Sequence, residues 1–349
     1  MSTERVLKQF ADQALACEYL GSPFTAMLCR LLAARLDVTS QFGRRILEWP
    51  GDPYADNVAL RACGALHGLA RSGYEPELTG IYPPHSCTEH QLWVTIVDVL
   101  RRHDHYLADQ LSSPPQTNEV ARSGILLGAM LHVAAITRMP LEIFEIGASA
   151  GLNLAFDEYD YNLGEGRVWG AGLAPLTIDI AWRGTNLPPL TASLLVVGRH
   201  GCDLRPLNPA NTPDRERLLS YVWADQAARL YRTAAAVQLA AVERRQIDEA
   251  DAADWLELQL RRPPTPGVTR VLFHTIVWQY LPAASKVRIE ALLAEVGASA
   301  TPQAPFAHIA VEADETPAKG ARIDLTIWPT GETVTLGRGD FHGRWAEWA

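Results

Sequence analysis

Apolar residues recur at helical spacing through the first 139 residues of the chain. Val6, Phe10 and Leu15 begin the pattern, and a longer repeat over residues 89–111 places its apolar positions on one side. A one-sided apolar pattern with this period is typical of amphipathic helices that pack on a core. We therefore predict a mostly helical N-terminal domain, or lid, over residues 1–139.

The pattern changes at residue 141. Leu141, Ile143 and Phe144 belong to a short apolar run that ends at Gly147, which indicates a buried parallel strand. Residues 147–151 are all small, so a ligand could approach the backbone closely there. A short helix follows. Strand, small-residue turn and helix N-terminus is the usual plan of nucleotide sites.

The remaining chain alternates strand-like and helix-like segments. We interpret residues 157–195 as a β-hairpin insertion. Further strands are predicted over 193–197, 269–277, 306–312, 322–329 and 332–337, and helices over 214–244 and 283–296, the last ended by Gly297. Such alternation predicts an α/β domain with a Rossmann-like, mostly parallel sheet over residues 140–349.

The three C-terminal strands have a topological consequence. If the first runs parallel to the main sheet and the other two form a meander, the last strand returns to the ligand-binding edge. That path would bring Arg338, Asp340 and His342 to the same edge as the small-residue loop. We predict a substrate-binding role for Arg338 and Asp340.

Composition limits the class of protein and its partners. The chain has 349 residues, a net charge of −9 and no Lys/Arg cluster, which argues against nucleic acid as a partner. Five scattered Cys without CxxC spacing indicate reduced thiols. The N-terminus is charged, and no run approaches the roughly 18 apolar residues of a membrane span. We expect a soluble cytoplasmic protein with a small-molecule partner, and the oligomeric state stays open.

The loop chemistry narrows the ligand. GxGxxG and GxxxxGK[ST] are the dinucleotide and phosphate-loop patterns, and 147–151 fits neither. A nicotinamide-dependent oxidoreductase, which needs the first pattern, is therefore disfavoured. Glu145 instead precedes the loop by two residues. A carboxylate suits a ligand that carries an ammonium and a sulfonium better than one that carries phosphates.

The pattern E-x-G-x-S-x-G resembles the first motif of class I S-adenosylmethionine (SAM)-dependent methyltransferases. The resemblance implies that the methionine end of SAM would be held by Glu145, Gly147, Ala148, Ser149, Gly151 and Asn153. Asp203 would bind the ribose, with Asp157 or Asp160 as alternatives, and a turn or cap role is equally open to it. Asp251 and Ala252 would contact the adenine, although acids are also favourable at a helix N-terminus.

Other polar residues are candidates for the substrate side of the site. The turn of Gln116, Thr117, Asn118 and Glu119 begins a helix, and a cap needs only one such residue, so binding is an alternative. His274 and Tyr280 follow a predicted strand and, with His342, are candidate bases or positioning groups. A His inside a strand is also a common core residue. The charged stretch 101–105 is interpreted as a solvated helix face.

Five segments together resemble a bacterial family known as domain of unknown function 2332. They are QTNE, EIGASAGLNL, GCDLRPLNP, VWQYLP and GRGDFHGRW, spread over most of the chain. The resemblance implies a methyltransferase-like fold and no particular substrate. We therefore predict a SAM-dependent methyltransferase acting on a small molecule. The alternative is a non-catalytic ligand- or partner-binding protein on the same fold.

Overall fold

The computed structural model describes residues 3–349, and their contacts divide the chain into two compact units. Met1–Thr117 and Asn211–Ala234 form a helical unit, whereas Asn118–Ala210 and Ala235–Ala349 form a unit built on a large sheet. The predicted boundary at residue 139 therefore differs from the observed division. The apolar helix before the first strand packs with the sheet, and a later segment returns to the helices.

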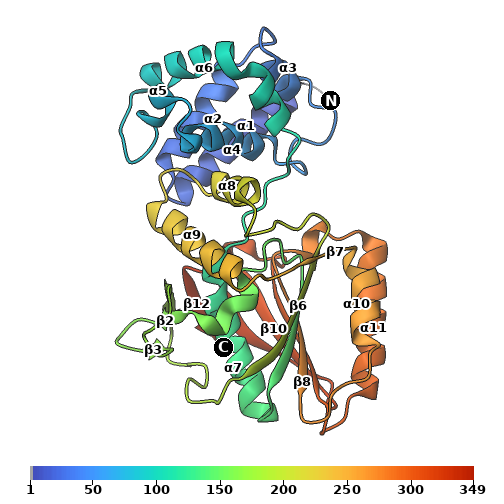
Figure 1. The fold of residues 1–349 in the computed structure, drawn as a ribbon. Coiled ribbons are helices and arrows are strands. Elements are labelled where there is room, and N and C mark those ends of the chain that lie inside the picture. The colour runs from blue at the N-terminus through green and yellow to red at the C-terminus, as the bar shows by residue number, and fades with distance from the viewer. Residues whose placement is uncertain (1–2) are drawn as a thin grey trace. The chain divides into compact units, whose positions relative to one another are not determined.

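The helical unit confirms the predicted helical character of the N-terminal region (Figure 1). Its helices are α1 Thr3–Tyr19, α2 Pro23–Arg35, α3 Gln41–Leu47, α4 Val58–Ser72, α5 Pro76–Thr79, α6 Glu89–Gln110 and α8 Thr212–Ser220, joined by the first half of α9 Ala227–Val242. The single helix predicted over 214–244 is wrong, because residues 221–226 turn to bind α2. Asp225 accepts a hydrogen bond from the Phe24 backbone N–H at 2.8 Å and another from Ser22 Oγ.

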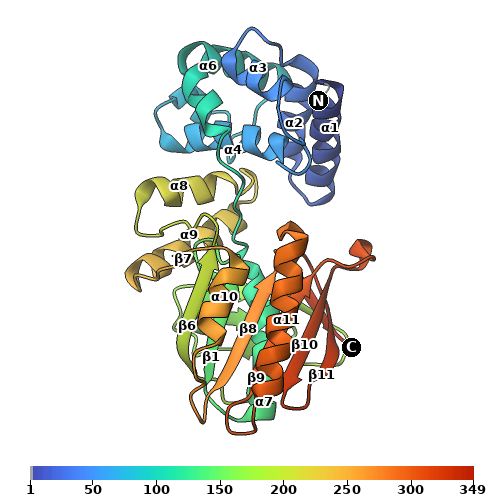
Figure 2. The ribbon, with the colours of Figure 1, turned by 90° about the vertical axis from the view of Figure 1, so that its right-hand side faces the viewer.

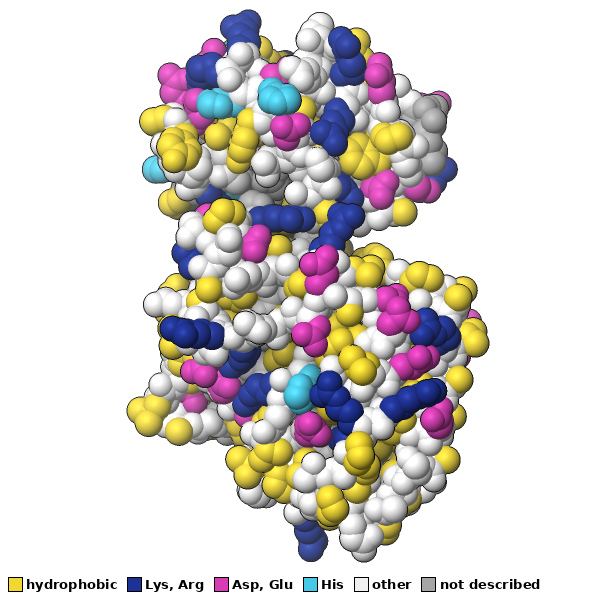
Figure 3. All heavy atoms as spheres, turned by 45° about the vertical axis from the view of Figure 1, so that its right-hand side comes forward, with side chains coloured by type: hydrophobic (Ala, Val, Ile, Leu, Met, Phe, Trp, Pro, Cys, Tyr) yellow, Lys and Arg dark blue, Asp and Glu magenta, His cyan; other side chains and the backbone are white. Residues whose placement is uncertain are grey.

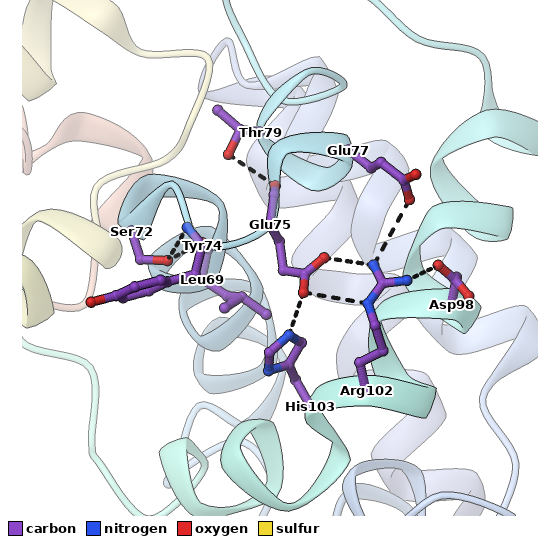
Figure 4. A network of polar contacts seen from close by, with 9 residues as sticks. All are labelled: Leu69, Ser72, Tyr74, Glu75, Glu77, Thr79, Asp98, Arg102 and His103. Carbon is purple, nitrogen blue, oxygen red and sulfur yellow. Dashed lines mark hydrogen bonds and ion pairs between the residues drawn. The ribbon is translucent and has the colours of Figure 1, made fainter.

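The charged stretch on α6 is largely solvated, as predicted, with Arg101, Arg102 and His105 exposed, but part of it also makes contacts within the unit. Arg102 and His103 both bind the buried carboxylate of Glu75, with Arg102 Nη2 at 2.5 Å from Glu75 Oε2 (Figure 4). The α6 backbone leaves helical geometry at His103, where φ is −127°. Arg102, and then His103, lower the pKa of Glu75. These contacts with Glu75 hold α6 against the segment that precedes α5.

The second unit contains a nine-stranded sheet in the order β5-β12-β11-β10-β9-β8-β1-β6-β7 (Figures 1 and 2). The strands are β1 Leu141–Ile146, β5 Ala181–Arg183, β6 Val196–Asp203, β7 Asp248–Glu249, β8 Thr269–Thr275, β9 Phe306–Glu312, β10 Ala321–Trp328, β11 Glu332–Gly339 and β12 Trp345–Trp348. The five neighbours from β7 to β9 pair in parallel. The next pairings, from β9 to β12, are antiparallel, so the sheet is mixed.

The order of the parallel strands creates a switch point. From β1 the chain goes outward to β6 and β7 on one side, then returns to β8 on the other side of β1. Ligands in open α/β sheets bind at the carboxyl ends of strands where the order reverses in this way. The candidate loop follows β1 and therefore lies at this switch point.

Helices cover both faces of the parallel part. α10 Ala252–Leu260 and α11 Ala283–Ser299 lie side by side over one face, with α7 Ser123–Thr137 on the other (Figures 1 and 2). With the short helix η1 Val120–Arg122, α7 makes a stretch of 18 residues that is long and apolar enough to cross a membrane. This differs from the sequence expectation. Because 72% of the stretch is buried in the fold, it has the character of a core helix.

Residues 157–195 form more than a hairpin. β2 Asp160–Asn162 lies between β3 Val168–Trp169 and β4 Thr177–Asp179 in a small sheet. β6 also starts later and runs further than the predicted 193–197. Its polar residues are tolerated because Arg199 pairs with Asp157 at 2.6 Å and His200 Nε2 lies 3.2 Å from Glu142.

Gly297 does not end α11, which continues to Ser299. A β-carbon at this position would lie 2.3 Å from Trp328 Nε1. The glycine therefore allows the helix to pack closely on the indole of β10. Close approach, rather than helix termination, explains the residue.

Candidate functional site

The loop after β1 has the backbone conformation that its small residues suggest. Gly147, Ser149 and Gly151 all have positive φ, at 68°, 54° and 70°. This left-handed region is easy for glycine and costly for other residues. Ser149 is thus a strained position inside a loop that otherwise uses glycine.

Asn118 holds the loop from outside. Its side-chain Oδ1 accepts hydrogen bonds from the backbone N–H groups of Ala150 at 3.2 Å and Leu152 at 3.1 Å. Glu119 caps η1 through Ala121 N, and Gln116 belongs to the helical unit. The predicted QTNE segment therefore contributes one residue, Asn118, that contacts the loop directly.

Asp203, at the end of β6, holds the loop from the other side. Its Oδ2 accepts from the backbone N–H of Ser149 and its Oδ1 from that of Arg205, both at 2.9 Å. Ala148 N–H donates to the carbonyl of Cys202, and Gly151 N–H to that of Ala148. Every backbone N–H from residue 148 to residue 152 thus donates within the protein. A phosphate would find these donors already used.

The groups left without partners at the loop are oxygen atoms. Within residues 3–349, neither Glu145 Oε2 nor Ser149 Oγ has a hydrogen-bond partner. Glu145 is 2% exposed, and burial raises its pKa well above the usual range. The charge of Asp203 acts in the same direction, whereas Arg122 and a hydrogen bond from Asn153 oppose it. A ligand cation would offset the cost of an ionised carboxylate here.

The end of β8 forms the other side of the switch point. A β-carbon at Gly147 would lie 2.2 Å from Val277 Cγ2, so the loop packs directly on the segment after β8. Ile276, just before it, has φ of 53°, an outlier for a β-branched residue. Arg122 donates to the Thr275 carbonyl at 3.3 Å. Backbone strain of this kind is concentrated at functional sites.

The C-terminal strands return to this edge as the topology predicts. β11 runs antiparallel to β10, and Arg122 Nε donates to the Phe341 carbonyl at 2.8 Å in the turn that follows. Within that turn, Asp340 pairs with Arg344 and accepts from His342 N–H at 3.0 Å. Arg338 pairs with Asp314. Both predicted substrate residues therefore lie at this edge of the sheet, and each already forms an ion pair within the protein.

His274 lies away from the loop. Glu145 pairs with Phe273 across parallel strands, and side chains alternate along a strand, so His274 faces the opposite side of the sheet. Its Nδ1 lies 2.7 Å from Glu312 Oε1, and its Nε2 lies 3.0 Å from His308 Nε2. His308 and Glu312 were not predicted, although they alternate with Ile309 and Val311 along β9 as polar positions on one face.

The remaining predicted residues have local roles. Asp251 caps α10 by accepting from Ala253 N–H at 2.9 Å, directly after β7. Its neighbour Ala252 is the first residue of that helix. Tyr280 is 66% exposed. Asp160, an alternative to Asp203, accepts from Gly172 N–H within the insertion.

Comparison with known proteins identifies the family of this chain. The model of a family described as an uncharacterized protein conserved in bacteria (DUF2332) matches residues 7–348. The chain belongs to this family. No curated protein and no solved structure matches it. The resemblance to DUF2332 seen in the sequence is confirmed.

One face of this DUF2332 protein carries mixed charge. On the face shown in Figure 3, Lys and Arg side chains are interspersed with Asp and Glu. Among residues 3–349, no group of three or more His, Cys, Asp or Glu is placed to hold a metal ion. The cysteines are free thiols.

Proposed function

We propose that the protein is a SAM-dependent methyltransferase that acts on a small molecule. The observation that carries the proposal is Glu145, a buried carboxyl group with one unpartnered oxygen at the carboxyl end of β1. The ammonium of the methionine end of SAM would pair with this group. Ser149 Oγ, also unpartnered, would accept or donate a second hydrogen bond to the same end of the ligand.

The arrangement of the sheet supports the proposal. Counted along the chain, the parallel strands β7-β6-β1-β8-β9 have the order 3-2-1-4-5 of doubly wound nucleotide-binding sheets. The internal use of the loop N–H groups also favours SAM over a dinucleotide, because pyrophosphate binding relies on such donors. Mixed surface charge agrees with a small-molecule substrate.

Methyl transfer needs alignment of the acceptor with the sulfonium more than it needs proton chemistry. A base is required only if the acceptor has a proton to lose. Of the three candidate bases, His342 lies in the turn that Arg122 holds beside the end of β8. We therefore assign His342, rather than His274 or Tyr280, to the acceptor side of the proposed site.

A binding protein without turnover is the second candidate. Asp203 and Asp251, which the resemblance assigns to ribose and adenine, already serve as a loop anchor and a helix cap. These local roles leave fewer lone pairs for a ligand. Turnover separates the two candidates. If a ligand co-purifies with the protein, and the protein shows no turnover when it is mixed with metabolite extracts, binding alone would be favoured.

Calorimetry with SAM and S-adenosylhomocysteine tests the proposal. Glu145→Gln should weaken binding about 10- to 150-fold, because a hydrogen bond to a charged group contributes roughly 1.5–3 kcal/mol. Glu142→Gln is the matched control, since Glu142 lies in the same strand and pairs with His200. No binding to the parent protein at millimolar ligand would refute the proposal, as would equal binding by both variants.

A further inference from the structure

A cavity lies on the face of the sheet opposite Glu145. Its volume is about 790 Å³, and it opens beside α11, over β8, β9 and β10. His308 and Ala310 of β9 line it, together with Glu312 at the strand end and the indoles of Trp278 and Trp328. Because Glu145 faces the opposite side of the sheet, this cavity is separate from the proposed SAM site and does not depend on it.

Hydrogen bonds fix the tautomers of the two histidines in this cavity. Glu312 Oε1 accepts from His274 Nδ1 at 2.7 Å and from the backbone N–H groups of Val277 and Trp278 at 3.0 and 3.2 Å. With His274 neutral, the acceptor at Nδ1 places the proton there and leaves Nε2 bare. His308 Nε2, 3.0 Å away, must then carry a proton and donate it. The remaining nitrogen, His308 Nδ1, is an acceptor.

His308 stays uncharged at neutral pH in this setting. Burial, as the largest cause, lowers the pKa of His308 to about 3. The ring of Trp278 stacks on His274, with centroids 5.2 Å apart and planes 18° apart, which holds the pair in place. Within residues 3–349, no donor contacts His308 Nδ1 or Glu312 Oε2. The cavity therefore offers two fixed acceptors and lacks a partner that donates to them.

The charges around these acceptors favour a cation. Five carboxylates and three basic side chains line the cavity. Two of the basic groups are already neutralised, since Arg338 pairs with Asp314 and Arg322 with Asp324 at 2.6 Å. Trp278 and Trp328 add aromatic surface, which attracts organic cations through the ring faces. An anion would meet carboxylates in excess.

We propose that this cavity binds a small organic amine whose N–H groups donate to His308 Nδ1 and Glu312 Oε2. His274 also lines the cavity, but Glu312 and His308 use both of its nitrogens, so we assign it a positioning role. Glu312 has a second role, since the same carboxylate holds the backbone of Val277, against which the Gly147 loop packs. A ligand bound to Glu312 would therefore also contact the group that positions Val277, which lies between the cavity and the Gly147 loop.

The test uses the full chain and three probes of similar size: 2-phenylethylamine, 2-phenylethanol and 3-phenylpropionate. Saturation-transfer NMR measures binding, and protein with labelled imidazoles reports on His308. The amine should bind in the millimolar range and shift the His308 ring signals. The alcohol and the carboxylate should bind about tenfold more weakly or not at all. Equal binding of the carboxylate, or no amine binding at about 20 mM, would overturn the proposal.

Variants assign the contacts. Glu312→Gln and His308→Leu should each weaken amine binding about tenfold or more. His308→Asn keeps an acceptor oxygen near the Nδ1 position and should restore most of the affinity. His200→Gln is the control, since His200 stacks on Phe144 over the same face and does not line the cavity. Circular dichroism checks folding of each variant. Unchanged binding in folded His308→Leu or Glu312→Gln would contradict the assignment.

Discussion

Glu145 is the residue on which the proposed function depends, and its cost to the ligand-free fold can be measured. Burial, and then Asp203, raise its pKa in the folded protein above the ordinary value of 4.5. The folded state therefore keeps this proton over a pH range in which the unfolded chain has released it. The stability linked to this proton is fully present below about pH 4.5 and is lost as pH rises through the folded pKa.

Glu145→Gln should reveal this loss. Glutamine cannot ionise, so the variant should gain stability relative to the parent as pH rises from about 4.5 toward the folded pKa, by at most about 1.4 kcal/mol per pH unit. Thermal unfolding at several pH values measures the difference. The stability difference between Glu142→Gln, in the same strand, and the parent should not grow in this way as pH rises. A difference between Glu145→Gln and the parent that does not change with pH would mean that Glu145 is ionised in the fold.

Gly147 shows how tightly the loop is packed. Gly147→Val would force φ of 68° on a β-branched residue and place its β-carbon 2.2 Å from Val277 Cγ2. Strain of about 1–3 kcal/mol and a similar cost of overpacking should both appear. Gly164→Val has φ of 79° with nothing within 4 Å, so it should show the strain alone. Urea unfolding measures the loss of stability in each variant. Equal losses would mean that the Val277 segment moves aside at no cost in free energy.

At the scale of single elements, α4 shows that the effect of replacing a helical glycine depends on the side chains packed against it. Gly64 and Gly68 lie one turn apart in this helix. A β-carbon at Gly64 would lie 2.6 Å from the ring of Tyr221, whose hydroxyl donates to the Ser113 carbonyl at 2.8 Å and cannot easily move. A β-carbon at Gly68 would meet Ser220 Cβ at an ordinary 3.4 Å.

The two alanine variants should therefore differ in sign. Gly68→Ala should stabilise the helical unit by up to about 1 kcal/mol, the difference in helix propensity. Gly64→Ala gains the same propensity but should lose about 1–3 kcal/mol by overpacking. Denaturant unfolding followed by helical circular dichroism gives both values. Stabilisation by Gly64→Ala would show that Tyr221 does not pack on α4 as described.

At the scale of the whole molecule, the chain enters the helical unit twice. Residues 211–234 belong to that unit although the sheet unit lies before and after them in sequence. Asp225 is a polar link, because its carboxylate accepts from the Phe24 N–H in the first turn of α2, as an N-cap residue would, and from the Ser22 hydroxyl. The helical unit therefore folds from two separate stretches of chain.

Asp225→Ala should destabilise the helical unit by about 1–2 kcal/mol, the usual cost of losing a cap. Glu216→Ala, in the same segment, removes only a half-exposed pair with Arg71 and should cost less than about 1 kcal/mol. Hydrogen exchange resolves the two units separately. Slower or unchanged exchange in α1 and α2 of Asp225→Ala would contradict the assignment of residues 211–234 to this unit.

The local pattern of the sequence by itself determined much of this protein. The helical N-terminal region, the strand of residues 141–146, the small-residue turn and the strand of residues 306–312 all follow from period and turn chemistry. The return of the last strands to the edge at the carboxyl end of β1 followed from counting strand directions. These features depend on interactions between near neighbours, and near neighbours are what a sequence displays.

Contacts between distant residues decided the rest. Asp225 breaks the helix predicted over 214–244 because it binds α2, about two hundred residues earlier. Arg199 and His200 stay in a strand because Asp157 and Glu142 neutralise them. Asp203 and Asn118 anchor the loop, and His274 joins His308 and Glu312 across neighbouring strands on the face away from Glu145. Pairing of polar groups across the fold selects among the roles that each residue could have, and only the tertiary structure shows which pairs form.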